Sequence, residues 1–585
     1  MNCQNMEIKL KNGFTLFHHQ VETMKWMEKR EASKEKGIKG GIVCHTMGLG
    51  KTLTALAFSF QNKGKFPTLI VTSKTVLSEW KHEGVEKFFI TQSNEENGTG
   101  GAVLNALYLH RDYLGKGIEK IDREQLMKYD IVITTYDVCV STCHKGKYYE
   151  QCLETEENNF TSINCRRRKG ANLSKLKGTA VIYGTPWGRV ICDESQRFSN
   201  PKTKIYKYMM AIYGKYKWCL SGTPIRNYET DIWTQLRFCG YHSVNNHREW
   251  NQNGHKIFKE ERLSDAIFLI DYSSTKIQLP EKYENEIKVS LTGKHREVYE
   301  EFLNETRVAY KKMMLDLCSF TNVLAMFTRL RQCAIAPYLI TPDAKRTRKT
   351  KKQNQDAWHL DKDGEAGILS CKIQKIVSII KEVTYKEKKD VFSLKTLAQK
   401  AVRENFHADD LRNMHSKHQG LFNNDHPTKV IVFSMFTSCL DLLGDALRTS
   451  YPTFKFVQID GSTTNRTSLL DKFKIDPAIQ GLLLTYKVGS EGLNLTEATH
   501  CICVEPWWTN SVHNQAKARC WRTGQTKPVH VHNIIIEGSI EERIVEVCKG
   551  KDDMASSYLK GTERTFKAGP KLDKYTLGKM LGMKF

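Results

Sequence analysis

Two short segments carry residue types suited to phosphate chemistry. The first, MGLGKT at Met47–Thr52, lies between an apolar strand-like run and an apolar helix-like run. Glycines let backbone N–H groups approach a phosphate, the lysine reaches the outer phosphate oxygens, and the threonine can ligate magnesium. The pattern predicts a phosphate-binding loop, in which His45 stands where glycine is usual, made of His45, Thr46, Met47, Gly48, Leu49, Gly50, Lys51 and Thr52.

The second segment is RVICDESQ at 189–196, which delivers Asp193 and Glu194 to the end of a strand. One carboxylate can hold magnesium, and the next can orient and deprotonate an attacking water. Taken alone, the segment could equally be an acidic pair in a surface loop. Together with the phosphate-binding loop, it predicts a site that hydrolyses a nucleoside triphosphate.

Arg519 and Arg522 lie far from both segments, in the run NQAKARCWRTGQTKP. Their spacing of three predicts that both project from one face of a helical turn. They could stabilise the negative charge that spreads over a γ-phosphate during transfer. Because the same spacing is ordinary on any solvated helix, the pair gains meaning only from its sequence context.

Short β-branched runs alternate with helical patterns, and they do so twice. The first set contains GGIVCHT, TLIVTS, DIVITTY, RVICDE and WCLSGT, and the second KVIVFSMF, FKFVQID, GLLLTYK, HCICVEP and VHVHNIII. Strands separated by amphipathic helices predict parallel sheets that bind ligands at the carboxyl ends of their strands. We therefore expect an α/β protein with two lobes. Leu291–Leu339 has helical spacing and is expected to project from the first lobe.

The composition limits the partners. Lys and Arg number 89 against 65 Asp and Glu, which gives a formal charge of +24. Such a balance favours a polyanionic partner, with a merely solvated basic surface as the alternative. No apolar run is long enough to span a bilayer, and no signal peptide is evident. The 17 cysteines include no CxxC pair and predict a reducing compartment. One insertion holds spacings looser than a structural zinc site usually has: Cys139, Cys143, His144, Cys152 and Cys165.

The ordered segments resemble the SWI/SNF-like ATPases of helicase superfamily two, from about Phe14 to Val547. The sequences VEPWWTN and GQTKPVHV resemble the subgroup that contains helicase-like transcription factor and the polymerase-releasing termination factor. Unlike several members of that subgroup, this chain has no RING-type array of cysteines and histidines. Departures from the family are His45 and Thr46 before the loop, Gln196 where histidine is usual, and Ala518 where aspartate is frequent. None removes a group that hydrolysis needs. The segments that carry the resemblance are FTLFHHQVETMKWM, MGLGKT, TLIVTSKTVLSEWKHE, ITTYD, WGRVICDESQRFSN, CLSGTPIRN, LRQCAIAPYLI, QIDGSTTNR, TYKVGSEGLNLTEATHCICVEPWWTN and QAKARCWRTGQTKPVHVHNIIIEGSIEERI.

This resemblance implies two RecA-like parallel-sheet lobes with helical protrusions between them. The expected segments are an ATP-binding lobe at 1–275, a helical protrusion at 276–342, a basic linker at 343–366, a helicase lobe at 367–548 and a basic tail at 549–585. A nuclear-import signal is the alternative interpretation of the basic linker.

It also implies a DNA-dependent ATPase that uses ATP and magnesium, with Thr52 and Asp193 as the metal ligands. Lys51, Asp193, Glu194, Arg519 and Arg522 would carry the chemistry. Gln20 would read the adenine edge, and Gln525 would complete the nucleotide site. The nucleic-acid contacts would come from Lys74, Thr134, Thr135, Thr485 and Trp508. For Trp508, a core-anchor role is the alternative to base stacking, since tryptophan buries much surface.

The implied function is translocation on double-stranded DNA to remodel or displace bound protein, in chromatin, transcription or repair. The alternatives are a strand-separating DNA or RNA helicase and a non-hydrolysing DNA-binding scaffold. Nucleosomes or RNA polymerase would be the protein partners of a monomeric motor that needs no membrane. We expect it in the nucleus, or in the host cell or virion if the protein is viral.

Overall fold

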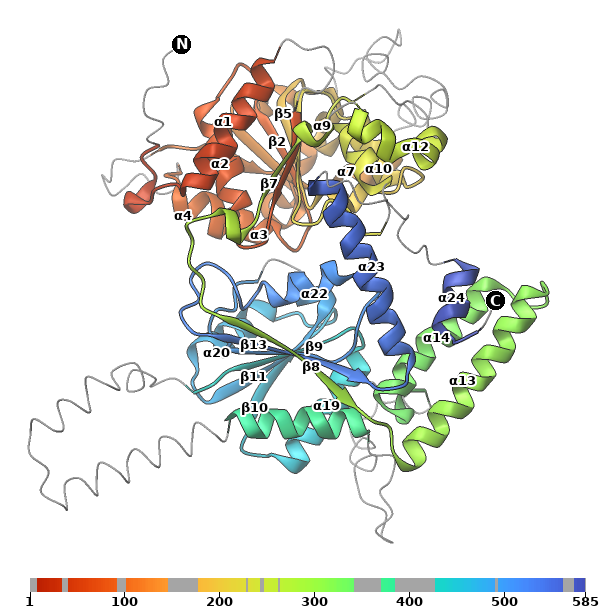
Figure 1. The fold of residues 1–585 in the computed structure, drawn as a ribbon. Coiled ribbons are helices and arrows are strands. Elements are labelled where there is room, and N and C mark those ends of the chain that lie inside the picture. Colours follow the sequence, from red (N-terminus) through yellow and green to blue (C-terminus); the bar gives the residue numbers. More distant parts are fainter. Residues whose placement is uncertain are drawn as a thin grey trace, which may run out of the picture. The chain divides into compact units, whose positions relative to one another are not determined.

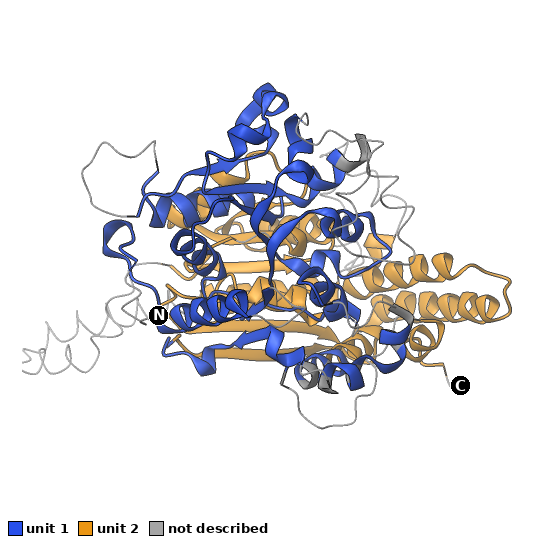
Figure 2. Cartoon of the chain, turned by 90° about the horizontal axis from the view of Figure 1, so that it is seen from above, with its two compact units in different colours: residues 1–278, 550–569 blue, residues 279–549, 570–585 orange. Residues whose placement is uncertain are grey.

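The computed structural model describes residues 8–33, 40–91, 102–145, 177–227, 230–241, 247–260, 263–340, 370–384, 427–489, 493–560 and 573–583. The chain divides into two compact units (Figure 2). Unit 1 is Met1–Gln278 with Gly550–Gly569, and unit 2 is Leu279–Lys549 with Pro570–Phe585. Each unit is built on one parallel sheet (Figure 1), so the predicted α/β class with two parallel sheets is confirmed.

Unit 1 contains a seven-stranded sheet in the order β3-β4-β2-β5-β6-β1-β7. Every neighbouring pair is parallel, so the carboxyl ends of all strands share one edge. Five of the strands coincide with the first set of predicted runs; the short β3 and β7 were not predicted. The strands are β1 Gly40–His45, β2 Thr68–Thr72, β3 Ala106–Tyr108, β4 Ile131–Thr135, β5 Trp187–Asp193, β6 Gly214–Leu220 and β7 Ile267–Ile270.

Helices cover both faces of this sheet, which explains the continuous apolar runs of its strands. Alternate residues of one strand enter different cores: Val190 lies in one hydrophobic cluster and Ile191 in the other. The cluster around Ile191 includes Met24 of α1 and Phe58 of α2. The helices are α1 His18–Ala32, α2 Lys51–Gln61, α3 Leu77–Glu79, α4 Glu86–Phe88, α5 Arg111–Leu114, α6 Arg123–Leu126, α7 Tyr136–Lys145, α9 Val181–Gly184, α10 Lys204–Ala211, α11 Thr230–Phe238 and α12 His247–Glu260.

Unit 2 contains a six-stranded parallel sheet in the order β10-β11-β9-β12-β13-β8. Its edge strand β8 falls within the expected helical protrusion and was not predicted. The sequence KYENEIKV is mostly exposed there, so it shows no apolar run. The strands are β8 Lys282–Val289, β9 Val430–Ser434, β10 Lys455–Ile459, β11 Ile479–Thr485, β12 His500–Cys503 and β13 Val529–Ile536.

The predicted helices of Leu291–Leu339 are present as α13 Gly293–Met314 and α14 Phe320–Ile335. Ser319 caps α14 by accepting a hydrogen bond from Asn322 N. The expectation that these helices project from the first lobe was wrong, because they share a hydrophobic core with the second sheet. Phe327 and Leu330 of α14 lie in the same buried cluster as Val432 of β9.

The remaining helices of unit 2 surround the same sheet, and residues 371–384 form one of them. The expected basic tail at 549–585 is partly folded: α24 buries Leu577 and Met580 in the core of unit 2. In the described part of the chain, no helix is long and apolar enough to cross a membrane. The other helices are α19 Thr437–Ser450, α20 Arg466–Ile475, α21 Tyr486–Gly489, α22 Asn510–Lys517, α23 Ile540–Lys560 and α24 Lys574–Met580. Of these, α23 begins in unit 2 and ends in unit 1, to which Gly550–Gly569 belongs.

The expected linker at 343–366 lies outside the described residues, and so does a polar stretch of the sequence at 386–426 that is rich in histidine. So does most of the cysteine-containing insertion, from 146 to 176.

Candidate active site

The predicted phosphate-binding loop connects β1 to α2 at the carboxyl edge of the first sheet. Gly48 and Gly50 have φ values of 87° and 74°, a left-handed conformation that strains other residues. A Cβ atom at Gly50 would also lie 2.4 Å from Gln20 Nε2. The loop therefore needs both glycines, and it ends at the N-terminus of an 11-residue helix, where backbone N–H groups favour an anion.

Side chains outside the loop bind its carbonyl groups. His19 Nε2 donates to Leu49 O over 2.9 Å, and Tyr272 donates its hydroxyl to Met47 O over 2.7 Å. Gln20 Nε2 donates to Gly50 O over 3.3 Å, while its Oε1 accepts from Phe17 N. Gln20 is thus buried against the loop, and in this conformation its amide supports the glycine turn.

His45 does not turn its imidazole toward the loop. The side chain is fully buried, and its Nε2 lies 2.9 Å from Thr23 Oγ1 of α1. Burial, aided by Lys51 and His19, lowers the pKa of His45 to about 3, so the ring is neutral. Its contribution to the loop is its carbonyl oxygen, which accepts from Lys51 Nζ over 2.8 Å.

Lys51 is the first residue of α2, and its amine lies over the segment that follows β6. A Cβ at Gly222 would come within 3.6 Å of Lys51 Nζ. The charge of Lys51 also acts on Asp193, whose pKa it lowers. The structure therefore brings the predicted lysine and the predicted acidic segment to one place.

Asp193 ends β5, and its buried carboxylate accepts three hydrogen bonds. Trp80 Nε1 and Thr72 Oγ1 donate to Oδ2 over 2.9 and 3.1 Å, and Glu194 N donates to Oδ1 over 3.0 Å. Burial and the neighbouring Glu194 nevertheless raise the pKa of Asp193 to about 6. A cation close to this carboxylate would favour its ionised form.

Glu194 follows in a left-handed conformation, with φ 48° and ψ 48°, which turns the chain out of the strand. Its carboxylate accepts from Gln196 Nε2. Gln196 Oε1 accepts from Ser221 Oγ over 2.6 Å, and Ser221 Oγ accepts from Thr223 N over 3.0 Å. A chain of hydrogen bonds thus joins the acidic segment to the SGTP segment after β6.

Other residues that hold this site were not proposed as site residues from the sequence. Tyr136 donates its hydroxyl to Asp193 O over 2.7 Å. Asp231 Oδ2 accepts from Arg226 N and Asn227 N, which fixes the end of the SGTPIRN segment. Thr72 and Tyr136 stand at the ends of predicted strands, and that position was the available signal.

Arg519 and Arg522 lie in unit 2, just beyond the end of α22, in turns rather than on a helix. The expectation of a shared helical face was therefore wrong. Arg519 Nε donates to Gly489 O over 3.0 Å, and Arg522 Nη1 donates to Leu493 O over 3.2 Å. The two arginines thus bind the described residues on either side of 490–492, at the carboxyl side of β11.

Gln525 also lies in unit 2, and its amide is used by backbone groups. Nε2 donates to Thr496 O, Ala498 O and Cys520 O, and Oε1 accepts from Thr526 N and Lys527 N. With this side chain 7% exposed, we assign Gln525 to holding the loop that carries Arg522, in place of the expected nucleotide contact.

Two of the three threonines expected to contact nucleic acid, Thr134 and Thr135, are fully buried. Thr134 donates its hydroxyl to Leu109 O over 2.9 Å, and Thr135 Oγ1 accepts from Val138 N in the first turn of α7. In this conformation both hydroxyls therefore serve the sheet and the helix start. Lys74 differs, since its side chain is 59% exposed and lies 3.5 Å from Asp112.

The remaining two nucleic-acid candidates lie in unit 2. Thr485 ends β11 and is 6% exposed. Trp508 is half-buried, with its ring 5.0 Å from that of Phe327 and beside the core. This packing favours the core-anchor alternative for much of the ring. In the described part of the chain, no group of His, Cys, Asp and Glu residues is arranged to hold a metal ion.

Two family models match long segments of the sequence. The SNF2-related domain matches residues 19–339, more than half of the chain, and the helicase conserved C-terminal domain matches residues 411–524. The chain belongs to the SNF2 family. It is therefore an ATP-binding, ATP-dependent enzyme of the helicase-like class.

Relatives of this SNF2-family chain come from viruses and cells. "Putative helicase 172L" of Invertebrate iridescent virus 6 is 60% identical over 99% of this chain and 97% of its own length. "DNA repair protein RAD5A" of Arabidopsis thaliana is 26% identical over 88% of this chain and 53% of its own length, so this chain spans about half of it.

One similar solved structure is the "Sulfolobus solfataricus SWI2/SNF2 ATPase core in complex with dsDNA". It is 21% identical, covers 100% of both chains and gives a TM-score of 0.36.

Proposed function

We propose that this SNF2-family ATPase translocates on double-stranded DNA and uses ATP hydrolysis to remodel or displace DNA-bound protein. The observation that carries the proposal is the convergence of Lys51, Asp193 and the Glu194–Gln196–Ser221 chain at one sheet edge. This arrangement connects a hydrolytic site to a second segment of the same unit. A motor needs such a connection to transmit the state of its nucleotide.

In this proposal Glu194 orients and deprotonates the attacking water, and Lys51 binds the outer phosphate oxygens. The donor set also suits magnesium, which prefers carboxylate and hydroxyl oxygens. Asp193 and Thr52 would hold the ion, which would supply positive charge to the phosphates. The pKa of Asp193, raised to about 6 by burial and Glu194, fits a carboxylate built to face a cation.

Arg519 and Arg522 would supply positive charge to the γ-phosphate from the second unit. Their contacts with Gly489 O and Leu493 O support this role, because they attach both side chains to one segment at a strand's carboxyl end. Movement of that segment would then move the arginines.

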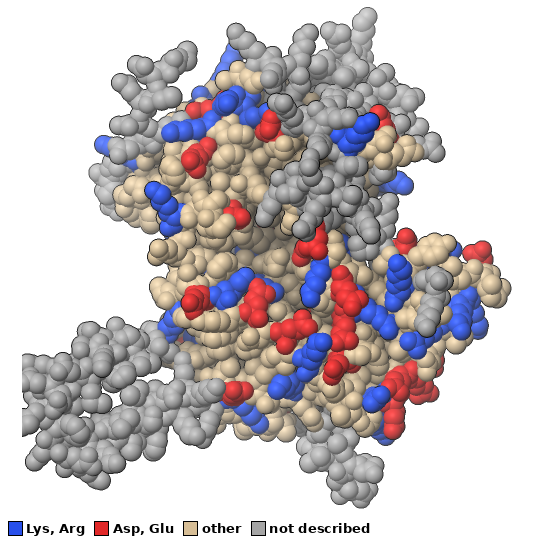
Figure 3. Space-filling view, viewed as in Figure 1, with Lys and Arg blue, Asp and Glu red and all other residues tan. Residues whose placement is uncertain are grey.

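Duplex DNA would be bound through its phosphates, so binding should weaken with salt. The charge of +24 supports a polyanionic partner. On the face of unit 2 seen in Figure 3, however, acidic and basic side chains are intermingled. Ion pairs of unit 2 include Lys282–Glu284 and Lys288–Glu542, in which a basic side chain is matched by an acidic one.

The competing functions are a strand-separating helicase, which the name of the iridovirus relative favours, and a non-hydrolysing scaffold. The same relative favours action in an infected host cell or in a virion. Nucleosomes or an RNA polymerase remain the proposed protein targets, and a monomer the proposed form.

The test is the ATPase rate with duplex DNA, single-stranded DNA or single-stranded RNA at equal salt. We expect duplex DNA to stimulate most; stimulation by single-stranded RNA alone would refute the duplex translocase. Lys51→Ala and Glu194→Gln should each lower turnover by about a hundred- to a thousandfold. Lys207→Ala, an exposed lysine on α10, is the matched control and should leave turnover unchanged.

A further inference from the structure

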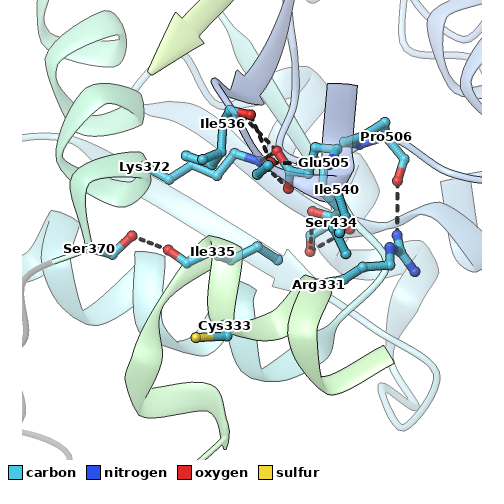
Figure 4. A network of polar contacts seen from close by, with 12 residues as sticks. Arg331, Cys333, Ile335, Ser370, Lys372, Ser434, Glu505, Pro506, Ile536 and Ile540 are labelled. Carbon is cyan, nitrogen blue, oxygen red and sulfur yellow. Dashed lines mark hydrogen bonds and ion pairs between the residues drawn. The ribbon is translucent and has the colours of Figure 1, made fainter. Parts of the chain in front are cut away.

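Unit 2 buries a cluster of four charged side chains apart from the Arg519 turn. Arg331 comes from α14, Lys372 from the helix at 371–384, Glu505 from the segment after β12, and Glu541 from α23. Each is at most 1% exposed. Figure 4 shows Arg331, Lys372 and Glu505 gathered from their separate elements. Since burying charge is costly, such a cluster indicates a requirement for fixed geometry.

Three of these charges have partners that fully explain their positions. Lys372 Nζ donates to both carboxylate oxygens of Glu541 over 2.7 Å, and Glu541 Oε2 also accepts from Ile536 N. Glu505 accepts from Ser434 Oγ and Met435 N at the end of β9. These contacts join the helix at 371–384 to α23, and the segment after β12 to the end of β9.

Arg331 is different, because its guanidinium contacts mainly one short segment, apart from the ring of Phe436, whose centre lies 5.5 Å from the guanidinium carbon. Nη2 donates to Pro506 O over 2.9 Å, as Figure 4 shows. The guanidinium carbon lies 4.6 Å from the ring centre of Trp507 and 5.5 Å from that of Trp508. Its Nε has no hydrogen-bond partner among the described residues. Most contacts of the Arg331 guanidinium are therefore with Pro506–Trp508.

A second residue on the same face of α14 also contacts Pro506–Trp508. Phe327 lies one helical turn before Arg331, and its ring is 5.0 Å from that of Trp508. Both tryptophans remain half-buried, at the carboxyl end of β12. Parallel sheets bind ligands at this edge, so the two half-exposed rings are placed where a ligand would meet them.

We propose that Arg331 is a positioning residue for DNA engagement, which fixes Trp507 and Trp508 so that duplex DNA meets a preset aromatic surface. The inference rests on the proposed duplex translocase. Preset side chains lower the ordering cost of binding, so loss of Arg331 should weaken the response to DNA more than the response to ATP.

The test is Arg331→Lys, which keeps the charge but loses the planar group that stacks on two rings. We expect the duplex concentration giving half-maximal ATPase stimulation to rise about tenfold. The KM for ATP should change by less than about twofold. Phe327→Leu removes the ring contact with Trp508 without altering a charge. It should shift the half-saturating duplex concentration in the same direction, and it keeps the test valid even if the Arg331 variant folds poorly.

The matched control is the double variant Lys372→Met with Glu541→Gln, which removes the neighbouring buried pair and leaves no orphan charge. It should leave the half-saturating duplex concentration within about twofold of wild type. An equal rise in this control would show that Arg331 acts only through general stability, and would overturn the inference.

A mutant cycle separates positioning from an independent effect. In a Trp507→Leu/Trp508→Leu background, Arg331→Lys should add less than about a twofold change. A full additional tenfold loss would overturn the inference. If wild type shows no duplex stimulation, the proposed function fails and the inference with it. If wild type is stimulated and Arg331→Lys behaves normally, the inference alone fails.

Discussion

Ser221 donates its hydroxyl hydrogen to the amide oxygen of Gln196 over 2.6 Å. Gln196 donates in turn to the Glu194 carboxylate, and Thr223 N donates to Ser221. The proposed catalytic carboxylate is thus connected by side chains to the segment after β6. Gln196 departs from the histidine usual in the family, and its amide serves as donor and acceptor at once, a pairing that needs no titratable group.

Gln196→Ala should lower kcat by about tenfold to a hundredfold, because the charged Glu194 loses a hydrogen bond that orients it. The KM for ATP should stay within about twofold, since neither Lys51 nor the phosphate-binding loop is altered. Steady-state ATPase assays over a range of ATP concentrations measure both quantities.

Ser195→Ala is the control for this prediction. Ser195 is adjacent and equally buried, but its hydroxyl donates to Gln235 Oε1 over 2.6 Å, outside the Glu194 chain. It should lower the melting temperature with little effect on kcat. If Gln196→Ala and Ser195→Ala reduced kcat equally, the Gln196 link would have no special part in hydrolysis.

Arg519→Ala should still bind ATP but hydrolyse it about a thousandfold more slowly than wild type, if the guanidinium acts as an arginine finger. Fluorescent-nucleotide titration would measure binding, and phosphate release would measure turnover. Arg448→Ala, an exposed arginine of α19 paired with Asp445, is the control and should be normal in both assays. Normal turnover in Arg519→Ala would exclude the finger role.

The strands that carry the ATP-site residues could be predicted from sequence, because burial on both faces makes their apolar runs continuous. The same rule explains the failure at β8, whose KYENEIKV sequence is mostly exposed at a sheet edge. The assignment of α13 and α14 to the wrong sheet has another cause. Except for β8, the strands of their sheet follow them in the chain, and local spacing cannot show which later strand a helix will cover.

Individual site residues were harder to predict than the segments that carry them. The position of Thr134 at a strand end suggested a ligand contact, yet its hydroxyl satisfies Leu109 O inside the sheet. Gln525 stands three residues after Arg522 in sequence, but five backbone groups use its amide. Such roles depend on which backbone groups are unpaired after folding, and sequence alone does not reveal them.

Cys371 should be the fastest of the described cysteines to alkylate near neutral pH. Hydrogen bonding from His295 and Thr292 lowers the pKa of its thiol to about 7, although burial opposes this. Cys318 is also partly exposed and serves as the internal control, whereas Cys44, Cys139 and Cys333 are among the buried cysteines. The rate advantage should be about fivefold, because greater thiolate content is partly offset by weaker nucleophilicity.

Timed iodoacetamide labelling at pH 7, followed by peptide mass spectrometry, would measure these rates. His295→Gln should slow labelling at Cys371 and leave Cys318 unchanged. Equal labelling of the two cysteines in the wild-type protein would contradict the assignment of a lowered pKa to Cys371.

Glu505 should make the free energy of unfolding depend on pH, and Glu505→Gln should remove that dependence. Burial raises the pKa of its carboxyl from 4.5 to about 7, so the folded state binds a proton that the unfolded state releases. The stability associated with this proton is fully present below pH 4.5 and is lost as the pH rises through about 7. Glu505→Gln should therefore gain stability relative to wild type across that window, on the order of 3 kcal/mol.

Melting curves at pH 5, 6, 7 and 8 would measure the difference in stability between Glu505→Gln and wild type. Glu546→Gln, which alters an exposed carboxylate of α23, is the control. A gap independent of pH would mean that the Glu505 carboxylate is already ionised in the folded protein at pH 5, held by the nearby charges of Lys372 and Arg331.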